Sequence, residues 1–379
     1  MIVEVHNQCD DYASYRAARV KSLFNVETGA NFDLIADLPL DGQEWKLGLV
    51  VGPSGSGKSS IGRTLWPDAF YEPDGWPSDA PIIDSINPEG KIDDVTAALA
   101  AVGLGTVPSW LRPYPVLSTG EKFRADLARV VCEQPDRVVF DEFTSVVDRQ
   151  IAKIGALAFS KAWRRTPGRA ILLSCHYDIV EWLQPDWIFD TESRDFTWGC
   201  LQPRPRISVD VHATDWRFWP RFEPHHYLRL GPMPFAQAYV ATVDDEPVAH
   251  LGMGSKYVGK QGVEARACRL VVMPEWQGAG VGVRFLNHVC QRYLDGDGHG
   301  KLAGRPMTTQ FHTSHPGLCA ALRRDKRWVQ ISASLHGTNR GNSMATMKKS
   351  DKSKRNNGRG GFGGHFRAVQ GFRFIGEAS

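Results

Sequence analysis

The sequence predicts an α/β protein made of two domains. Short apolar runs alternate with amphipathic stretches along most of the 379 residues, which is typical of sheets covered by helices. Glycine-rich corners between a predicted strand and a predicted helix occur twice, at residues 52–59 and 277–282. Residues 200–206 read Cys-Leu-Gln-Pro-Arg-Pro-Arg, which is typical of a linker between domains. A chain of this length usually forms more than one domain. We therefore expect a first domain over 1–203 and a second over 204–379.

Composition excludes several classes of protein. Hydrophobic residues make up 42% of the chain and charged residues 23%, so most of it can form folded cores. The net charge of +3 gives no whole-chain argument for a nucleic-acid partner. No apolar run reaches the roughly 18 residues of a membrane span, and the N-terminus does not resemble a secretion signal. The seven cysteines are scattered without a C-x-x-C pair, which indicates reduced thiols in a cytoplasmic protein. The shortness of the apolar runs predicts that this chain does not insert into a membrane.

The first domain contains the elements of a mainly parallel sheet. Apolar runs predict strands at 46–51, 137–140 and 170–174. Residues 59–66 are expected to open a helix, and residues 120–132 to form one because their apolar positions recur about every 3.6 residues.

The second domain is also predicted to mix strands and helices. Apolar patterns indicate strands at 238–242, 247–252 and 265–272, a helix at 281–294 and a last strand within 365–376. Residues 339–364 are rich in glycine, asparagine and basic side chains. Such a composition predicts a flexible basic insert or tail, because it cannot bury enough apolar surface to become ordered.

Residues 52–59 read GPSGSGKS and fit the phosphate-binding pattern G-x-x-x-x-G-K-S. The motif follows a predicted strand and opens a predicted helix, so backbone N–H groups and the helix N-terminus would surround phosphate oxygens. Lys58 is expected to bridge the β- and γ-phosphates of ATP, and the Ser59 hydroxyl to bind Mg²⁺. The predicted ATP-binding residues of this loop are Gly52, Pro53, Ser54, Gly55, Ser56, Gly57, Lys58, Ser59 and Ser60.

Two carboxylates follow the predicted strand at 137–140. Asp141 would hold Mg²⁺ at the carboxyl end of this strand, and Glu142 would polarise the water that attacks the γ-phosphate. An acidic pair after a strand is often only a solvated loop, but its position behind a phosphate-binding motif favours a catalytic role.

Three further motifs carry a resemblance to ABC-type ATPases that covers roughly residues 46–190. Residues 117–121 read LSTGE and resemble the LSGGQ signature of that family. Residues 145–148 look like its D-loop, and His176 looks like its switch histidine. The resemblance implies ATP hydrolysis by a head-to-tail homodimer, with His176 among the catalytic residues. It also implies that Ser118, Thr119 and Gly120 of one copy cap the γ-phosphate held by the other.

The chain departs from the family pattern in three places. Family members usually have a glutamine that contacts Mg²⁺ between the two motifs, whereas residues 80–86 contain none and Asp84, at a predicted strand end, is the candidate replacement. The aromatic residue that would stack on adenine is Phe24 or Phe32, and a plain core role for either stays open. The stretch between the motifs is short, so little room is expected for the family's helical subdomain.

Residues 270–282 read LVVMPEWQGAGVG and resemble motif A of GNAT acyltransferases, Q/R-x-x-G-x-G/A. The resemblance covers roughly 205–335, with the last strand at 366–375. It implies an α+β acyltransferase domain that binds acetyl-CoA or another acyl-CoA, with the pyrophosphate at the start of the helix. The predicted acyl-CoA-binding residues are Val271, Val272, Gln277, Gly278, Ala279, Gly280, Val281 and Gly282.

The acyl acceptor is not specified by the sequence. His226 and His315 are the predicted catalytic residues of this domain, with Glu264 as another candidate base. A structural role for each stays open. The basic segment fits contacts to nucleic-acid phosphates, although a solvated loop explains it equally well.

These observations predict a soluble ABC-type ATPase coupled to an acyl-CoA-dependent N-acyltransferase. Two alternatives stay open. One is a DNA-maintenance or defence ATPase whose GNAT-like domain only binds, and the other is the ATPase subunit of a transporter with separate membrane subunits.

Overall fold

The computed structural model divides into two compact units, and each unit contains two separate segments of the chain. Unit 1 comprises Met1–Trp76 and Val130–Pro205, and unit 2 comprises Pro77–Arg129 and Arg206–Ser379. The residues that the structure describes are 2–8, 12–25, 31–73, 75–228, 231–233, 235–257, 262–300, 303–334 and 368–377. The basic segment at 339–364 therefore lies outside the described residues.

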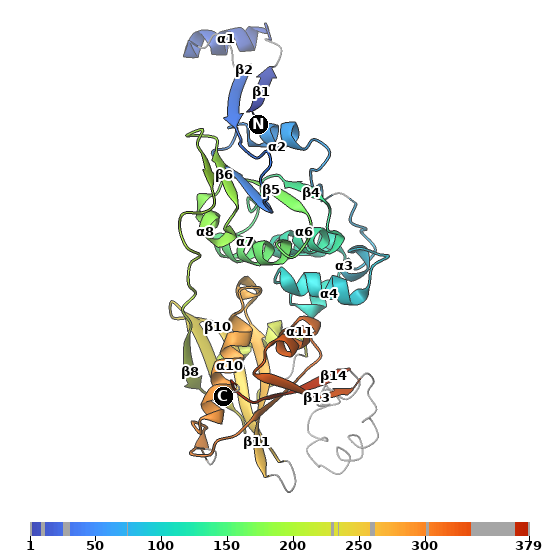
Figure 1. The fold of residues 1–379 in the computed structure, drawn as a ribbon, viewed down its shortest axis with the longest axis vertical. Helices are drawn as coiled ribbons and strands as arrows, with labels where there is room; N and C mark the ends of the chain where they lie inside the picture. Colours follow the sequence, from blue (N-terminus) through green and yellow to red (C-terminus); the bar gives the residue numbers. More distant parts are fainter. Residues whose placement is uncertain are drawn as a thin grey trace. The chain divides into compact units, whose positions relative to one another are not determined.

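Unit 1 is built on a five-stranded sheet with the order β4-β5-β3-β6-β7 (Figure 1). Its strands are β3 (Leu47–Val51), β4 (Arg137–Phe140), β5 (Arg169–Ser174), β6 (Trp187–Asp190) and β7 (Phe196–Trp198). All neighbours pair in parallel except β6 and β7. The strands predicted at 46–51, 137–140 and 170–174 are confirmed by β3, β4 and β5.

Helices cover both faces of this sheet. On one face, Ile61 of α2 (Lys58–Leu65) joins the buried cluster that contains Val139 of β4. On the other, the ring of Phe159 of α7 (Arg149–Trp163) lies 5.6 Å from that of Phe140. Because side chains of a strand alternate between faces, adjacent residues of β4 contact different helices. The short helices η2 (Tyr177–Ile179) and α8 (Val180–Leu183) follow β5.

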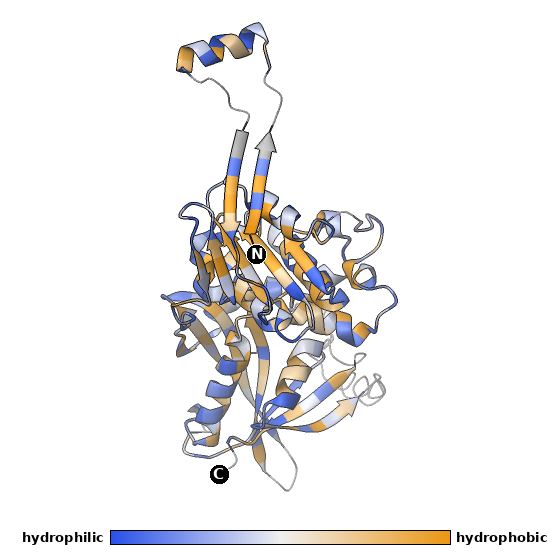
Figure 2. Cartoon of the chain, turned by 45° about the horizontal axis from the view of Figure 1, so that its top comes forward, coloured by the Kyte–Doolittle hydropathy of each residue, from blue (hydrophilic) through white to orange (hydrophobic). Residues whose placement is uncertain are grey.

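A separate two-stranded sheet precedes β3. Strands β1 (Ile2–Gln8) and β2 (Asn31–Asp37) pair in antiparallel fashion, with α1 (Tyr15–Phe24) between them in the sequence. Val3 and Leu34 are buried in the same cluster as Ile61, whereas α1 buries none of its residues. Hydrophobic residues are accordingly concentrated along the strands of unit 1 (Figure 2).

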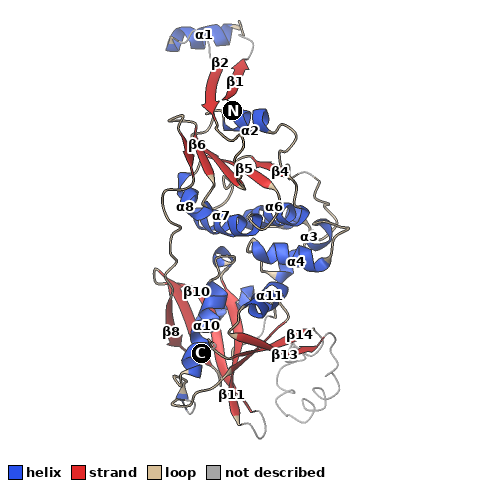
Figure 3. Cartoon of the chain, in the orientation of Figure 1, coloured by secondary structure: helices blue, strands red, loops and turns tan. Residues whose placement is uncertain are grey.

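Unit 2 contains a seven-stranded sheet with the order β13-β14-β12-β11-β10-β9-β8 (Figure 3). Its strands are β8 (Asp210–Thr214), β9 (Gln237–Val243), β10 (Glu246–Tyr257), β11 (Val263–Val272), β12 (Thr309–Thr313), β13 (Trp328–Ser334) and β14 (Val369–Phe374). Among the strands of this sheet that the structure describes, only β11 and β12 pair in parallel. The predicted second-domain strands and the helix at 281–294 are all present, the helix as α10 (Val281–Leu294).

Short helices join or flank this sheet. They are η3 (Trp216–Phe218), α9 (Trp219–Phe222), η4 (Glu223–His225), η6 (Pro274–Trp276) and α11 (Pro316–Arg324).

The segment 77–129 is helical and packs with the second half of the chain. It forms α3 (Ile82–Ser85), α4 (Ile92–Ala101), α5 (Val107–Trp110), η1 (Tyr114–Val116) and the first part of α6 (Thr119–Glu133). A Cβ placed on Gly317 of α11 would lie 2.3 Å from the Cβ of Ala100 at the end of α4. The stretch before the predicted signature thus forms two four-residue helices and one ten-residue helix. Residues 1–203, predicted as one domain, contribute to both compact units.

Candidate functional site

The predicted phosphate-binding loop connects β3 to α2 in unit 1, and we call residues 52–57 the nucleotide loop. Gly52, Gly55 and Gly57 all have positive φ angles, of 147°, 77° and 86°. Gly57 caps α2 in the left-handed region, where a residue with a Cβ is strained. A Cβ on Gly52 would also lie only 1.9 Å from Oγ1 of Thr191. The loop therefore requires glycine at these positions, as expected of a backbone that approaches phosphate closely.

Lys58 and Ser59, which follow the nucleotide loop, form hydrogen bonds with groups around it. The ammonium group of Lys58 donates to the carbonyl oxygens of Gly52, at 2.9 Å, and Pro53, at 2.6 Å. The hydroxyl of Ser59 donates to Oδ1 of Asp141 at 3.0 Å. Two of the three predicted Mg²⁺ ligands, Ser59 and Asp141, thus meet although they are 82 positions apart. The other predicted ATP-binding residues here, Pro53, Ser54, Ser56 and Ser60, lie in the loop or in the first turn of α2.

Two predictions for the nucleotide site have a different outcome. Asp84 lies on the short helix α3 of unit 2, so its placement at a strand end was wrong. Phe24 ends α1 with 71% of its surface exposed. Phe32 belongs to β2, but its side chain lies outside the described residues.

Glu142 and His176 follow the carboxyl ends of the neighbouring parallel strands β4 and β5. Glu142 is exposed, and its backbone has a φ of 48°. Nδ1 of His176 lies 2.9 Å from Nη1 of Arg149 and 3.3 Å from Oγ1 of Thr144. Since a guanidinium can only donate, Nδ1 must accept, and the proton of the neutral ring resides on Nε2. Burial and the charge of Arg149 both lower the pKa of His176, which maintains this neutral form.

The predicted signature, at residues 117–121 of unit 2, begins α6 with reciprocal capping contacts. The backbone N–H of Ser118 donates to Oε2 of Glu121 at 2.9 Å, and the N–H of Glu121 donates to Oγ of Ser118 at 3.3 Å. This is the capping-box arrangement. Because Oγ of Ser118 accepts in it, the hydroxyl proton is left to donate elsewhere. Thr119 and Gly120 form the first turn of α6.

The second glycine-rich corner lies in unit 2 between β11 and α10, and we call residues 277–282 the acyl-CoA corner. Gly278 and Gly280 have φ angles of 92° and 87°, and Gly280 caps α10. A Cβ on Gly282 would lie 2.8 Å from Cγ2 of Val272, so helix and strand approach closely there. The side-chain amide of Gln277 donates to the carbonyl of Val272 at 3.0 Å. Ala279 and Val281 are buried within this turn.

Strand β11 separates from β12 before it reaches this corner. The two strands pair only at residues 265–267 of β11 within the described part of the chain. Beyond that point the register between β10 and β11 shifts between His250 and Gly252, and Arg269 has a φ of 54°. Bulges of this kind turn backbone groups out of the ladder and are common beside active sites. The predicted residues Val271 and Val272 follow the bulge.

The predicted bases of the second domain are engaged within the fold. His315 caps α11: its Nδ1 lies 3.3 Å from the N–H of Leu318 and its Nε2 lies 3.1 Å from the carbonyl oxygen of Gly105. Both ring nitrogens are therefore occupied, which favours a structural role. His226 is 6% exposed, and the N–H of Leu228 donates to its Nδ1 at 3.3 Å.

Glu264 accepts from Oγ1 of Thr308 at 3.1 Å and pairs with Arg373 at 3.0 Å. It stands near the start of β11, whereas the acyl-CoA corner follows the end of that strand. This position separates Glu264 from the corner by most of the strand's length.

Comparison with known proteins gives matches to two families. The model of the acetyltransferase (GNAT) family matches residues 208–304. The cytochrome c biogenesis ATP-binding export protein CcmA of Rhodospirillum rubrum is 30% identical over 167 residues, covering 35% of this chain and 69% of that protein. The chain belongs to the family of ABC ATP-binding proteins.

Other ABC proteins match smaller shares or at lower identity. The nickel import ATP-binding protein NikO of Rhodobacter capsulatus is 39% identical over 88 residues, which cover 23% of this chain and 34% of that protein. The dimeric structure of the ATP-binding cassette MJ0796 with ADP and Pi has a TM-score of 0.36 and 12% identity, covering 50% of this chain and 94% of that chain. A putative cobalt transport ATP-binding protein has a TM-score of 0.37 and 16% identity, covering 57% and 85%. Within the described residues we find no helix with the length and apolar character of a membrane span.

Sequence reasoning missed a buried junction between the helix that begins at the predicted signature and the acyl-CoA corner, both in unit 2. Arg124, one turn after the signature, is 3% exposed, and its Nη1 donates to the carbonyls of Gly103, at 2.7 Å, and Pro274, at 2.5 Å. The N–H of Gly105 donates to Oε1 of Gln277 at 2.9 Å. A Cβ on Gly103 would lie 2.3 Å from the carbonyl oxygen of Gln277. The predicted signature and the acyl-CoA corner are thus joined by direct contacts within unit 2.

A second missed residue is His250, which is fully buried in β10 of the GNAT domain. Its ring lies 5.1 Å from those of Trp216 and Trp219 and 5.5 Å from that of Phe222. Burial lowers the pKa of His250 to about 4. A lone histidine among apolar strand residues gives no sequence signal that separates it from an ordinary core position.

Proposed function

We propose that this chain hydrolyses ATP as a head-to-tail homodimer and that its nucleotide cycle controls an acyl-CoA-dependent transferase on the same chain. The observation that carries the proposal is the junction at Arg124. Through it, the signature that would complete the ATP site of a second copy shares one compact unit with the corner that would hold acyl-CoA. The six described cysteines are free thiols, which supports a reducing, cytoplasmic setting.

On the nucleotide side, the proposed roles belong to residues at the carboxyl ends of β3, β4 and β5. Mg²⁺ would be held by Ser59 and Asp141, and it would neutralise phosphate charge. Lys58 would release its loop carbonyls to reach the phosphates. Glu142, exposed beyond β4, would polarise the attacking water, and the Nε2 proton of His176 would donate to the γ-phosphate.

In the homodimer, the donor that completes the site comes from the second copy. Its Ser118 hydroxyl, with the proton left free by the capping box, would donate to the same phosphate, and Thr119 and Gly120 would place backbone groups beside it.

On the acyl side, the backbone of Gly278–Gly282 would bind the pyrophosphate of acetyl-CoA or another acyl-CoA. The positive φ angles of Gly278 and Gly280 and the cap of α10 fit such an anion. The acceptor is an amine of a small molecule, a protein or a nucleic acid. His226 is retained as the proposed base because it lies in unit 2 beside the aromatic residues that precede β9.

The test on the nucleotide side is the substitution Glu142→Gln, with Glu192→Gln, an exposed residue of unit 1, as the matched control. We expect hydrolysis to fall at least about 100-fold, as for loss of a general base, while an ATP-bound dimer accumulates in gel filtration. The control should hydrolyse ATP at the normal rate. Normal turnover by the Glu142 variant would exclude this role.

A second candidate function is a GNAT domain that senses acyl-CoA without transferring the acyl group. The engagement of both ring nitrogens of His315 and of the Glu264 carboxylate favours it. Release of the CoA thiol, followed with a thiol reagent in the presence of mixed amine acceptors, separates the two functions. Acetyl-CoA binding without thiol release beyond the spontaneous rate supports sensing, and acceptor-dependent release supports transfer.

A further inference from the structure

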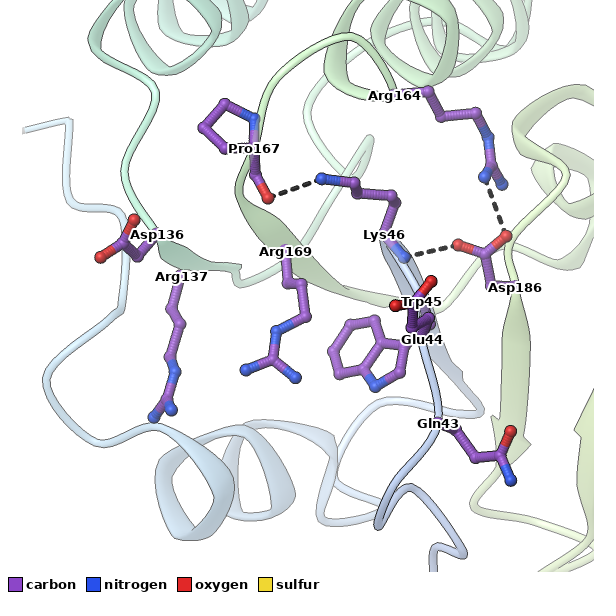
Figure 4. A pocket seen from close by; sticks show the side chains of 10 residues that line it. All are labelled: Gln43, Glu44, Trp45, Lys46, Asp136, Arg137, Arg164, Pro167, Arg169 and Asp186. Atoms are coloured by element: carbon purple, nitrogen blue, oxygen red, sulfur yellow. Dashed lines mark hydrogen bonds and ion pairs between the residues drawn. The ribbon is translucent and has the colours of Figure 1, made fainter.

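A cavity of about 780 Å³ opens on unit 1 at the amino ends of β3, β4 and β5 (Figure 4). The nucleotide loop lies at the opposite end of β3. Trp45 and Lys46 line the cavity just before β3 begins, and Arg137 and Arg169 line it as the first residues of β4 and β5. The nucleotide loop follows the other end of β3, roughly 17 Å away for a strand of this length. The cavity is therefore separate from the proposed ATP site.

Arg137 and Arg169, which we call the arginine pair, lie side by side. They are register partners on adjacent parallel strands, so their side chains leave the same face of the sheet. Both guanidinium groups lie over the ring of Trp66, at 5.6 and 5.7 Å from its centroid, and Arg169 also lies 5.3 Å over Trp45. The two indoles are stacked with centroids 5.5 Å apart. A rigid aromatic support thus holds two like charges together.

Three carboxylates, those of Glu44, Asp136 and Asp186, line the cavity together with the arginine pair. No described carboxylate forms an ion pair with either guanidinium. Asp186, which also lines the cavity, is already engaged by Arg164 at 2.8 Å and by two backbone N–H groups. Figure 4 shows the side chains of the pair extending in the same direction, with the carboxylate of Asp136 turned away from them.

Trp45 forms part of the cavity wall and is 7% exposed. Its indole stacks on Trp66 and lies beneath the guanidinium of Arg169. The ring therefore helps to fix the direction in which this side chain extends.

We propose that the arginine pair, supported by Trp45 and Trp66, binds the phosphate group of a nucleotide-sized ligand. Two guanidinium groups that point the same way offer more N–H donors than one carboxylate can accept. A phosphate group has enough oxygens to accept from both. The volume lies within the range of small-molecule sites and exceeds what one phosphate needs. The same chemistry belongs to a free nucleoside monophosphate and to a nucleotide of a single-stranded nucleic acid. This site goes beyond the proposed function and does not depend on it.

The test uses the full chain carrying Lys58→Ala, so that the nucleotide loop does not contribute binding. One arm titrates AMP by calorimetry, and the other follows a fluorescein-labelled single-stranded 12-mer by anisotropy. In that background, Arg137→Gln with Arg169→Gln should weaken binding at least tenfold. The lysine versions at both positions should bind with intermediate affinity, because they keep the charge and lose the forks.

The matched control is Arg165→Gln, an exposed arginine of unit 1 that does not line the cavity, and it should bind like the parent. In a chain with Lys58 intact, the double glutamine variant should hydrolyse ATP normally, which shows that unit 1 is folded. Binding of AMP alone assigns a free phosphorylated metabolite, and binding of the oligonucleotide alone assigns nucleic acid. If neither probe binds, or if the double variant binds both as tightly as the parent, the proposal is overturned.

Discussion

Replacing Arg124 with methionine removes the junction's buried donor while it keeps most of the side chain's length. In the native protein, Nη1 of Arg124 serves two carbonyls, those of Gly103 and Pro274. Leaving buried acceptors without this donor costs about 1–3 kcal/mol each, so we expect the free energy of unfolding of unit 2 to fall by about 3 kcal/mol. For a unit of more than 150 residues, that loss corresponds to a melting temperature lower by roughly 6–12 °C.

The assay is thermal unfolding combined with hydrogen exchange resolved by residue. Amides of α10 and β11 should exchange faster in the Arg124→Met protein, whereas those of β3 and β5 in unit 1 should not. Arg324→Met provides the control, since Arg324 is an exposed residue of α11 in the same unit. A melting temperature within about 2 °C of the parent's, or equal acceleration in both units, would refute the reasoning.

Three other substitutions test separate parts of the structure. Burial lowers the pKa of His250 from 6.5 to about 4, so its contribution to the free energy of unfolding is complete above pH 6.5 and decreases by about 3 kcal/mol as the pH falls to 4. In His250→Phe, the free energy of unfolding measured with urea should depend less on pH over that range. An unchanged pH dependence would contradict this. Gly280→Ala places a Cβ at a φ of 87°, which costs about 1–2 kcal/mol and should weaken acetyl-CoA about tenfold by calorimetry with ATP hydrolysis unaltered; unaltered acetyl-CoA affinity would argue against the corner. Gly52→Ala would place a Cβ 1.9 Å from Thr191, so binding of a fluorescent ATP analogue should be lost, and retained affinity would show that the loop does not hold phosphate.

The sequence was most informative where the deciding interactions are local. The apolar runs at β4 and β5 predict strands because strands buried on both faces contain little besides hydrophobic residues. The glycines at 52, 57 and 280 identify the two corners because each adopts a positive φ that other residues rarely tolerate.

Contacts between distant segments could not be predicted in the same way. Arg124 reads as an ordinary charged residue of an amphipathic helix, and only the fold brings it to Pro274, 150 positions away. Short apolar runs are ambiguous between strand and helix, so the sequence predicts a strand end at Asp84 where the structure has the helix α3. The polar sequence around His315 predicts a catalytic residue, whereas in the fold its two ring nitrogens contact α11 and Gly105.

The most direct test of the proposed link between the two sites is the affinity for acetyl-CoA with and without ATP. Calorimetry on the Glu142→Gln protein should give dissociation constants that differ at least fivefold when saturating Mg·ATP is added, with a reciprocal change in the affinity for ATP. The difference should shrink in the Arg124→Met background. Equal acetyl-CoA affinities in the two nucleotide states, in a protein that binds both ligands, would contradict the account.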